Sequence, residues 1–564
     1  MMVISRLTLL LATSFLAPQV LTSGQGAGPA ISFGVPVASD LKSGDVHEYG
    51  LPPVTAGGLV SGTLEVRGLA ALVQVVDAGG AVIRAEYFYE NAKPVSQRIG
   101  FVAPTAGGYR LQVRAFDRFR GGGQIIPGEP VPVVGTASGS YTLRMENAPV
   151  VVRMRGVDAP VREDCPSSRL RQLTQELEAG RHDALQSFWR EVDGKGPLFE
   201  DVDGNQRDVD VTFLWREIYD TRNVLVLWAG RIDDGYMTRL AGTDVWYKTV
   251  RLRRGSRLAY QISPNDREAD RSLTTQLDPL NSRAYPDDPT YRFRRSSVLD
   301  MPGAPDEQWA LRTPIRRGTI EERTVTSTLL KNQRPIWIYT PPGYEPTAGP
   351  YPLVILFDGP VYVSSRFLAA PATFDNLIND GRIRPAIVCF DSGSRGNAAG
   401  LEGARRYGDA LAQELMPMLR ASYPISTNAA DIVIGGFSAG GRAAAQVALF
   451  QPEICNVLSQ SGAFRAGMAE GADEPNASAR AYLDAPRQPI RFYLEVGLYD
   501  STPGADGPLY QFALDETNLG GNRHLRDVLR AKGYDVSYRE VGGGHDFVHW
   551  RAMLADGLMT LLKR

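Results

Sequence analysis

Residues 431–440 read DIVIGGFSAG, an apolar run that continues into a G-x-S-x-G pentapeptide. This pattern is typical of a strained turn between a buried strand and a helix, and the turn exposes a nucleophilic serine. Gly436 and Gly440 are the small neighbours that so tight a turn requires. A helix predicted over residues 441–450 would point its N-terminal amides at Ser438, where they stabilise negative charge on a reacting oxygen. The stretch therefore favours acyl hydrolysis over the alternative, a chance match in a chain with 58 glycines.

Apolar runs alternate with helical segments on both sides of this stretch, from residue 319 to the C-terminus. This alternation predicts a mostly parallel sheet with helices on both faces, and hence an α/β-hydrolase catalytic domain over residues 319–564. Their order places Ser438 at the end of a central strand. The predicted strands are 335–339, 352–357, 386–390, 431–434, 457–460, 491–496 and 537–541.

A serine nucleophile needs a general base, and the chain has five histidines. His47 and His182 precede the catalytic domain, whereas the base of an α/β-hydrolase follows the serine and the acid along the chain. His524 lies in a predicted helix, where a solvated surface histidine is expected. His545 follows the last predicted strand through three glycines, in the kind of loop that carries a catalytic base. We therefore predict His545 as the base, with His549 as the alternative.

The acid should follow the preceding strand and accept a hydrogen bond from the imidazole, fixing its tautomer. Asp500 occupies that place, Glu495 is the rival acid, and a serine–histidine pair without an acid is a further alternative. For the oxyanion hole we predict the backbone N–H of Ala439, together with the N–H of Asp358 or Gly359 after an earlier strand.

Composition bounds the remaining possibilities. At 564 residues the chain exceeds one hydrophobic core, so three or four domains are expected. A net charge of −2 gives no electrostatic footprint for nucleic acid. Only Cys165, Cys389 and Cys455 are present, so at most one disulfide can form, and Cys389 lies in an apolar run expected to be buried. No cysteine–histidine cluster suggests a zinc site, and we expect neither a metal nor an organic cofactor.

Residues 1–23 combine Arg6 with an apolar stretch and then change to small and polar residues. This predicts a secretory signal peptide, and hence a periplasmic or secreted protein. The alternative is an uncleaved anchor, but the apolar stretch is short for a membrane span and Pro18 interrupts it. No later segment is long and apolar enough to cross a membrane.

Two β-rich regions precede the catalytic domain. Short β-rich runs separated by glycine- and proline-rich turns predict an antiparallel sandwich over residues 31–152. Within it, residues 101–113 and 139–143 resemble the bacterial pre-peptidase C-terminal domain, a secreted accessory module. An unrelated sandwich is the alternative.

A helical stretch over residues 167–192 and a second β-rich region complete a predicted domain at 167–310. Its sequence resembles the N-terminal, immunoglobulin-like domain of enterochelin esterases. Plain core packing is the simplest role for its tryptophans. The resemblance is carried by residues 188–190, 196–198, 211–216, 242–249, 278–281 and 297–305.

The catalytic domain resembles the esterase D and enterochelin esterase superfamily. The residues that carry the resemblance are 336–344, 356–359, 436–441, 458–462 and 543–551. Members of that family hydrolyse the ester bonds of ferric catecholate siderophores such as ferric enterobactin, which weakens chelation and releases iron. The resemblance implies Ser438 as nucleophile, His545 as base and Asp500 as acid. Iron would then arrive only as part of the substrate.

Two departures from the family pattern bear on the substrate. Arg395 is a candidate for binding an anionic ligand, but Gly396-Asn397 follows it where the family usually has a Glu-Leu pair. Ala463-Phe464 follows Ser-Gln-Ser-Gly, where the family often has more aromatic residues. Two alternatives therefore stand beside the siderophore esterase: a carbohydrate esterase that removes feruloyl or acetyl groups, and an inactive hydrolase-fold binding protein.

Overall fold

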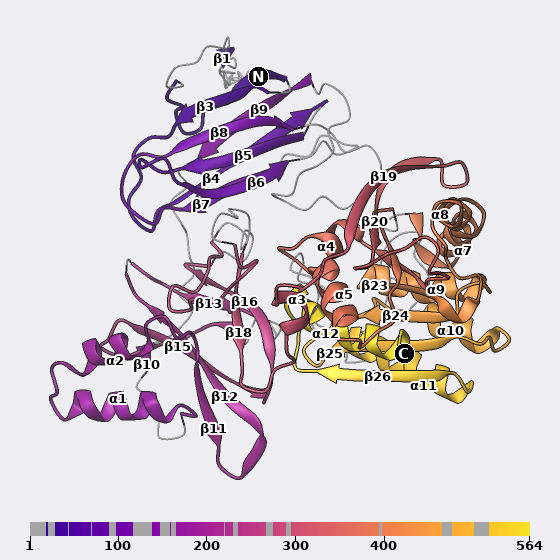
Figure 1. Cartoon of the computed structure of the whole chain (residues 1–564). Coiled ribbons are helices and arrows are strands. Elements are labelled where there is room, and N and C mark those ends of the chain that lie inside the picture. The colour runs from indigo at the N-terminus through magenta and orange to yellow at the C-terminus, as the bar shows by residue number, and fades with distance from the viewer. Residues whose placement is uncertain are drawn as a thin grey trace, which may run out of the picture. The chain divides into compact units, whose positions relative to one another are not determined.

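The computed structural model describes residues 19–20 and 29–563, apart from residues 43, 69, 89–96, 117–137, 147–157, 160–164, 219, 229–234, 267–273, 289–294, 394–396, 465–475 and 501–517. The predicted signal peptide lies almost entirely outside these residues. The chain divides into two compact units, Met1–Arg118 with Val133–Val151 and Phe119–Pro132 with Val152–Arg564 (Figure 1).

The first unit contains two sheets that share one core. A five-stranded sheet has the order β1-β2-β9-β4-β7, and a four-stranded sheet has the order β3-β8-β5-β6. Pairing is antiparallel except between β1 and β2. Leu64 and Leu143 of the first sheet belong to the same buried cluster as Val73 and Leu111 of the second. The strands are β1 (Gln19–Val20), β2 (Val37–Lys42), β3 (Val46–Gly50), β4 (Leu59–Arg67), β5 (Ala70–Val76), β6 (Val82–Phe88), β7 (Gln97–Val102), β8 (Arg110–Phe116) and β9 (Ser138–Glu146).

The second unit contains two helices near its start, where the sequence predicted one helical stretch. α1 (Ser168–Glu178) is capped by Ser167, whose side chain accepts a hydrogen bond from the Leu170 N–H. The helix ends before Gly180, which adopts a φ of 77° that favours glycine. α2 (Ala184–Val192) then packs Phe188 and Trp189 against Leu214, Leu240 and Val245 of a single following sheet.

Two sheets follow these helices. The first has the order β10-β14-β15-β12-β11 and the second the order β13-β16-β18-β17. Trp215 and Trp246 of the first sheet share a buried cluster with Val226 and Ile262 of the second, so these tryptophans do serve core packing. The strands are β10 (Asp158–Ala159), β11 (Leu198–Val202), β12 (Asn205–Arg216), β13 (Val224–Leu227), β14 (Thr238–Leu240), β15 (Val245–Arg253), β16 (Arg257–Pro264), β17 (Ala284–Tyr285) and β18 (Ser296–Asp300).

An eight-stranded sheet forms the C-terminal part of the second unit, with the order β19-β20-β22-β21-β23-β24-β25-β26. The strands from β22 to β26 pair in parallel, whereas β20 pairs antiparallel with both β19 and β22. The sheet is therefore mostly parallel, with an antiparallel edge formed by β19 and β20. The strands are β19 (Thr319–Ser327), β20 (Asn332–Thr340), β21 (Leu353–Phe357), β22 (Ile387–Asp391), β23 (Ile432–Phe437), β24 (Asn456–Gln460), β25 (Arg491–Gly497) and β26 (Asp535–Val541).

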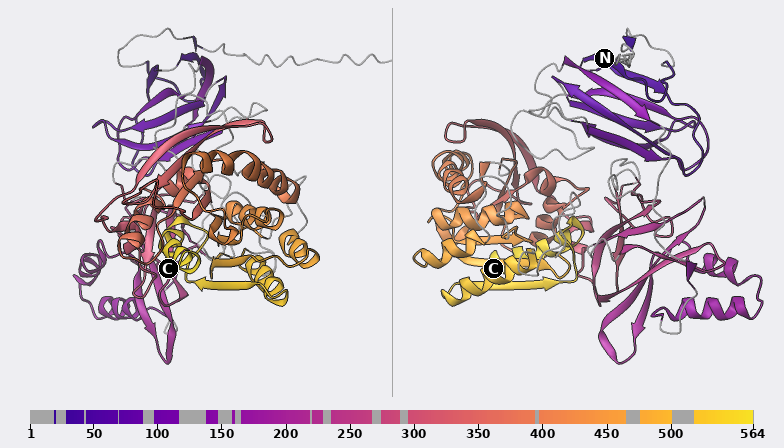
Figure 2. Two further views of the ribbon diagram at one scale, coloured as in Figure 1. Left: turned by 45° about the vertical axis from the view of Figure 1, so that its right-hand side comes forward. Right: turned by 180° about the vertical axis from the view of Figure 1, so that it is seen from behind.

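Helices cover both faces of this sheet (Figure 2). Alternate residues of β21 point to opposite sides, since Ile355 belongs to one buried cluster and Val354 to the other. The helices are α3 (Gln308–Leu311), α4 (Gly359–Val363), α5 (Ala370–Asn379), α7 (Gly400–Ala410), α8 (Met416–Ser422), α9 (Ala439–Phe450), α10 (Ala477–Asp484), α11 (Asn518–Ala531) and α12 (Phe547–Leu561), with a π-helical turn at Leu411–Leu415 and a 3-10 turn at Ala429–Asp431. In the part of the chain that the structure describes, no helix has the length and apolar character to cross a membrane.

Candidate active site

Ser438 lies in a strained turn between β23 and α9, as the pentapeptide predicts. Its backbone has φ 51° and ψ −121°, a conformation that is costly for a residue with a side chain. A Cβ atom at Gly436 would lie 2.7 Å from the carbonyl carbon of Gly440, so glycine at 436 permits the close approach of strand and helix. The Ser438 N–H donates to the Gln460 carbonyl at 2.9 Å, which fixes the turn against β24.

His545 and Asp500 meet Ser438 at the carboxyl ends of the parallel strands. Nε2 of His545 lies 2.9 Å from Oγ of Ser438. Nδ1 of the same ring lies 3.0 Å and 3.1 Å from the two carboxylate oxygens of Asp500. An N–H on Nδ1 donating to Asp500 leaves Nε2 as an acceptor for the serine proton. The arrangement can therefore remove a proton from Ser438 as that oxygen attacks a carbonyl carbon.

Exposure differs within this group in a way that suits the same chemistry. Asp500 is 1 % exposed, whereas 32 % of the His545 side chain is exposed. The histidine and serine therefore face the solvent side of the site, and the carboxylate is sheltered beneath them. A sheltered carboxylate holds the imidazole without competition from water.

Asn518 is a site residue that sequence reasoning missed. It is the first residue of α11, it is buried, and its Nδ2 donates to Oδ1 of Asp500 at 3.1 Å. The same nitrogen lies 3.0 Å from Nδ1 of His545. Asn518 thus helps to hold the carboxylate in place, and no motif in the sequence distinguishes it from other asparagines.

The rival acid and bases occupy other positions. Glu495 is fully buried on β25, where its Oε1 accepts from Gln460 Nε2 at 3.3 Å. Its other oxygen lies 3.5 Å from Nε2 of His549, so Glu495 pairs with His549 and not with His545. His549 is buried on α12, and His524 is exposed on α11, as expected of a surface histidine.

A buried charge cluster lies beside the His545 loop. His549 is 1 % exposed and lies between Glu495 and Asp546, with its Nδ1 3.7 Å from Oδ1 of Asp546. Burial alone would lower the pKa of His549, but the two carboxylates outweigh it and raise the pKa to about 10. Burial likewise opposes ionisation of Asp546, but the charge of His549 and hydrogen bonds from the main-chain N–H groups of Ala259 and His549 keep its pKa below the usual value. At neutral pH, His549 is therefore a buried cation beneath the site.

The predicted oxyanion-hole residues lie at the ends of two neighbouring strands. Asp358 follows β21 in the left-handed region, with φ 57°, and Gly359 begins α4. Ala439 begins α9 directly after Ser438, and β21 and β23 are paired in parallel. A Cβ atom at Gly359 would lie 2.6 Å from the carbonyl carbon of Phe390, so glycine lets this turn pack on β22. The assignment of the donating amides stays a prediction.

Arg395, the predicted anion-binding residue, lies outside the described residues. Asp391, the last residue of β22 and four residues before Arg395, forms a buried ion pair with Arg334 that the sequence did not reveal. Asp391 accepts from Arg334 Nε at 2.8 Å and Nη2 at 3.0 Å, and also from the Tyr407 hydroxyl at 2.6 Å. The Gly393 N–H donates to the same carboxylate at 2.9 Å.

Metal ligands do not gather in the part of the molecule that can be described. Among those residues, no group of three or more histidine, cysteine, aspartate or glutamate side chains could hold a metal ion. The three cysteines are buried, and Cys389 is fully buried as predicted.

Comparison with known proteins gives matches in the second unit. The family model described as "Putative esterase" matches residues 327–561, and the model "Enterochelin esterase, N-terminal" matches residues 210–310. An iron(III) enterobactin esterase of Escherichia coli O6:H1 is 29% identical over 419 residues, which cover 67% of this chain and 96% of the relative. An iron(III) salmochelin esterase of the same organism is 28% identical over 428 residues, covering 70% of this chain and 98% of the relative.

A solved structure is similar over the same share of the chain. The enterobactin esterase from Shigella flexneri, crystallised in the presence of enterobactin, superposes with a TM-score of 0.52 at 27% sequence identity. The match covers 67% of this chain and 97% of that one.

Proposed function

The chain belongs to the enterochelin esterase family, and we propose that it is a serine esterase that hydrolyses the ester bonds of a catecholate siderophore of the ferric enterobactin type, releasing iron. The named relatives are iron(III) enterobactin and iron(III) salmochelin esterases, and the chain spans 96% and 98% of their lengths. The observation that carries the proposal is the contact of His545 with both Ser438, at 2.9 Å, and Asp500, at 3.0 Å.

In the proposed mechanism, Ser438 Oγ attacks the ester carbonyl carbon while Nε2 of His545 takes its proton. Asp500 holds the imidazole in the required tautomer and stabilises the imidazolium that forms. The amide of Ala439, with that of Asp358 or Gly359, would receive the negative charge on the carbonyl oxygen. His545 then returns the proton to the leaving alcohol, which leaves an acyl-enzyme.

Water then hydrolyses the acyl-enzyme, with water as the nucleophile and Ser438 as the leaving group. His545 takes a proton from water, the resulting hydroxide attacks the acyl carbon, and Ser438 leaves with the proton from His545. These steps use only side chains and main-chain amides of the protein. We propose that no metal or organic cofactor takes part and that iron is carried in by the substrate.

We make further proposals for the parts of the chain that precede the catalytic domain. We propose a signal peptide over residues 1–23, which would take the protein to the periplasm or beyond. We further propose two β-sandwiches, over residues 31–152 and within 167–310, because in each region two sheets contribute to a single buried cluster. The catalytic domain would then occupy residues 319–564.

A substrate panel tests the proposed function. Purified full-length protein is given ferric enterobactin, a feruloyl sugar ester and an acetyl sugar ester, and product release is followed by liquid chromatography. We expect kcat/KM for ferric enterobactin to exceed that for either sugar ester at least tenfold. The reverse order would indicate a carbohydrate esterase, and no turnover of any ester would favour an inactive binding protein.

A further inference from the structure

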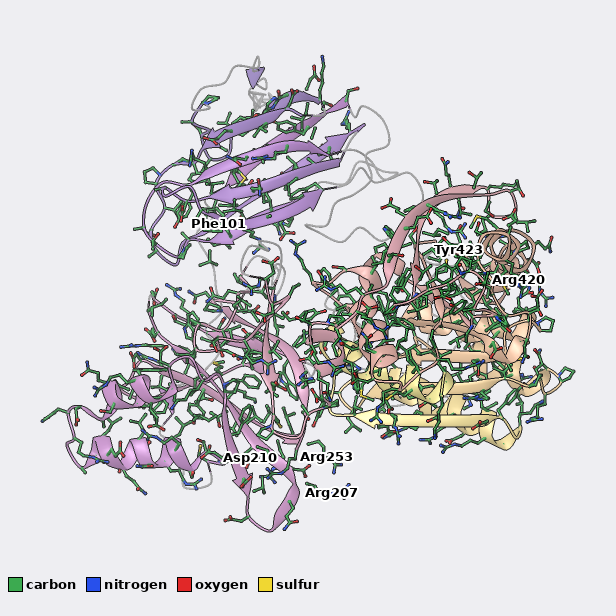
Figure 3. All side chains as sticks on the ribbon, in the orientation of Figure 1. Phe101, Arg207, Asp210, Arg253, Arg420 and Tyr423 are labelled. Atoms are coloured by element: carbon green, nitrogen blue, oxygen red, sulfur yellow. The ribbon has the colours of Figure 1, made fainter. Side chains whose placement is uncertain are left out.

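A short segment of the immunoglobulin-like region (residues 167–310) contacts both the loop that carries His545 and the loop that carries Asp500. This segment, residues 253–259, runs from the end of β15 into β16, and Arg253 is labelled in Figure 3. Its main-chain amides are the donors. The Arg253 N–H donates to the Tyr499 hydroxyl at 2.6 Å, and the Arg257 N–H donates to the Gly542 carbonyl at 2.7 Å. The Ala259 N–H donates to Oδ2 of Asp546 at 3.2 Å.

The topology of the sheet explains why these amides point toward the catalytic loops. β18 pairs with β16 from Arg257 to Tyr260 on one side. On the other side, β13 pairs with β16 from Pro264 to Gln261 in the part of the chain that the structure describes. The beginning of β16 therefore has an edge beyond β13, and the catalytic loops accept hydrogen bonds from that edge.

The two catalytic loops are themselves joined. The Leu498 N–H donates to the Val541 carbonyl at 2.7 Å, and the Tyr499 N–H donates to the Gly543 carbonyl at 2.9 Å. A Cβ atom at Gly497 would overlap the Gly543 carbonyl oxygen, so the two backbones are in close contact. A shift of either loop must therefore move the other, and with them Asp500 and His545.

Side chains add to the main-chain contacts. The ring of Tyr499 packs edge-to-face on Trp228, with centroids 5.9 Å apart, against the buried cluster of the immunoglobulin-like region. A Cβ atom at Gly542 would lie 2.8 Å from Cα of Ser256, so this contact has no room for a methyl group. The side chain of Arg257 is fixed in turn by Asp300 Oδ1 at 2.9 Å.

We propose that residues 253–259 act as a positioning element for catalysis: the immunoglobulin-like region sets the distance and angle between His545, Asp500 and Ser438. The inference rests on the proposed roles of these three residues. Because a misplacement of about 1 Å costs on the order of 100-fold in rate, three hydrogen bonds to these loops are sufficient to matter. The region would then act on the chemical step itself, whatever it contributes to binding substrate.

Two variants weaken the contact at different points. Tyr499→Phe removes the acceptor for the Arg253 N–H and keeps the ring on Trp228. Gly542→Ala forces a methyl group against Ser256. Tyr493→Phe is the matched control, since Tyr493 lies on β25, the strand that leads to Tyr499, and loses a 2.9 Å hydrogen bond to Asp556, away from residues 253–259.

The readouts are the second-order rate of Ser438 labelling by a fluorophosphonate and kcat/KM for ferric enterobactin, with the thermal midpoint measured alongside. We expect Tyr499→Phe and Gly542→Ala each to lose tenfold or more in both rates, while Tyr493→Phe stays within twofold of wild type. In an Asp500→Asn background, Tyr499→Phe should cost less than twofold, because there is no longer an aligned carboxylate to lose. A merely structural role would reduce the rate equally in both backgrounds.

The outcomes separate this inference from the proposed function. The positioning role would be overturned if Tyr499→Phe and Gly542→Ala both kept wild-type rates. It would also be overturned if Tyr499→Phe caused equal losses with and without Asp500→Asn. Either result would leave the esterase assignment intact. A wild-type protein that neither labels at Ser438 nor cleaves any ester would contradict the proposed function.

Discussion

Ser438 shows how much of the site depends on backbone conformation. Its positive φ is held by the hydrogen bond from its N–H to Gln460 at the end of β24, and by glycines at 436 and 440. A Cβ atom at Gly440 would lie 2.7 Å from Oδ2 of Asp358, so this glycine also admits the loop that follows β21. The two glycines of the pentapeptide therefore serve the shape of the turn, whereas Ser438 supplies the nucleophile.

Gly436→Ala tests this division of roles. The added methyl group would collide with the Gly440 backbone and push α9 away from β23, so Ser438 would move relative to His545. We expect labelling by a fluorophosphonate to fall at least about 100-fold. Gly108→Ala, at a position with open space, is the control and should label normally. Normal labelling of Gly436→Ala would show that the turn tolerates a side chain.

His549 should make stability depend on pH. Its pKa is about 10 in the folded protein against 6.5 as a reference, so the folded state binds the proton more tightly. The stabilisation it gives is fully present below pH 6.5 and is lost as pH rises toward 10. We expect the difference in unfolding free energy between wild type and His549→Gln to shrink in that window, by at most about 1.4 kcal/mol per pH unit. Urea unfolding at several pH values measures it, and a difference that does not change with pH would contradict it.

The sequence predicted the site unevenly at this scale. Ser438 was accessible because the strand, turn and helix signals are contiguous, and His545 and Asp500 followed from chain order at strand ends. Asn518 was not, because its contact with Asp500 depends on how the start of α11 packs. The contacts of the amides of residues 253–259 could not be predicted either, because almost every residue type has a main-chain N–H donor.

Among the elements, β20 and β22 are joined by a buried ion pair. Arg334 and Asp391 are 1% and 0% exposed at their side chains, and Tyr407 of α7 completes the group. The negative charge of Asp391, together with Tyr407, outweighs the effect of burial and raises the pKa of Arg334 above its usual value. The group therefore ties an antiparallel strand, a parallel strand and a helix at the edge of the site.

Arg334→Met should be strongly destabilising, because it leaves Asp391 buried and without its cation. We expect a loss of about 3 kcal/mol or more in unfolding free energy. Arg323→Met is the matched control on the neighbouring strand, where the ion pair with Glu321 is partly exposed and worth little. Denaturant midpoints compare the two, and equal small losses would mean that the buried pair is dispensable.

Strand prediction succeeded for every strand of the catalytic sheet except the edge strand β19. All seven predicted strands of the catalytic sheet are present. Most are apolar runs buried on both faces, whereas β26 is partly polar and partly exposed and was still predicted. β19 was missed because its sequence, TIEERTVTS, is mostly polar and exposed, as an edge strand can be. For the same reason the antiparallel edge of the sheet was not expected. The helical stretch predicted over 167–192 is two helices, and the break between them was missed because Gly180 is its only sequence signal.

At the scale of the whole molecule, both matched family models fall within the second compact unit. A chain truncated to residues 152–564 should therefore fold and retain ferric enterobactin hydrolysis within about threefold of the full protein. Truncation to 319–564 removes residues 253–259 and should lose at least tenfold more activity. Steady-state kinetics with circular dichroism as a fold check would decide, and full activity of the shorter chain would contradict the positioning role.

The most direct measurement of the central claim is hydrolysis of ferric enterobactin by wild type and by Ser438→Ala. Ser422→Ala is the matched serine control, since its hydroxyl is exposed on α8 and bonded to Arg323. We predict that wild type and Ser422→Ala cleave the substrate at equal rates and that Ser438→Ala loses at least about 1,000-fold in kcat. A Ser438→Ala variant that cleaves ferric enterobactin at the wild-type rate would contradict the account.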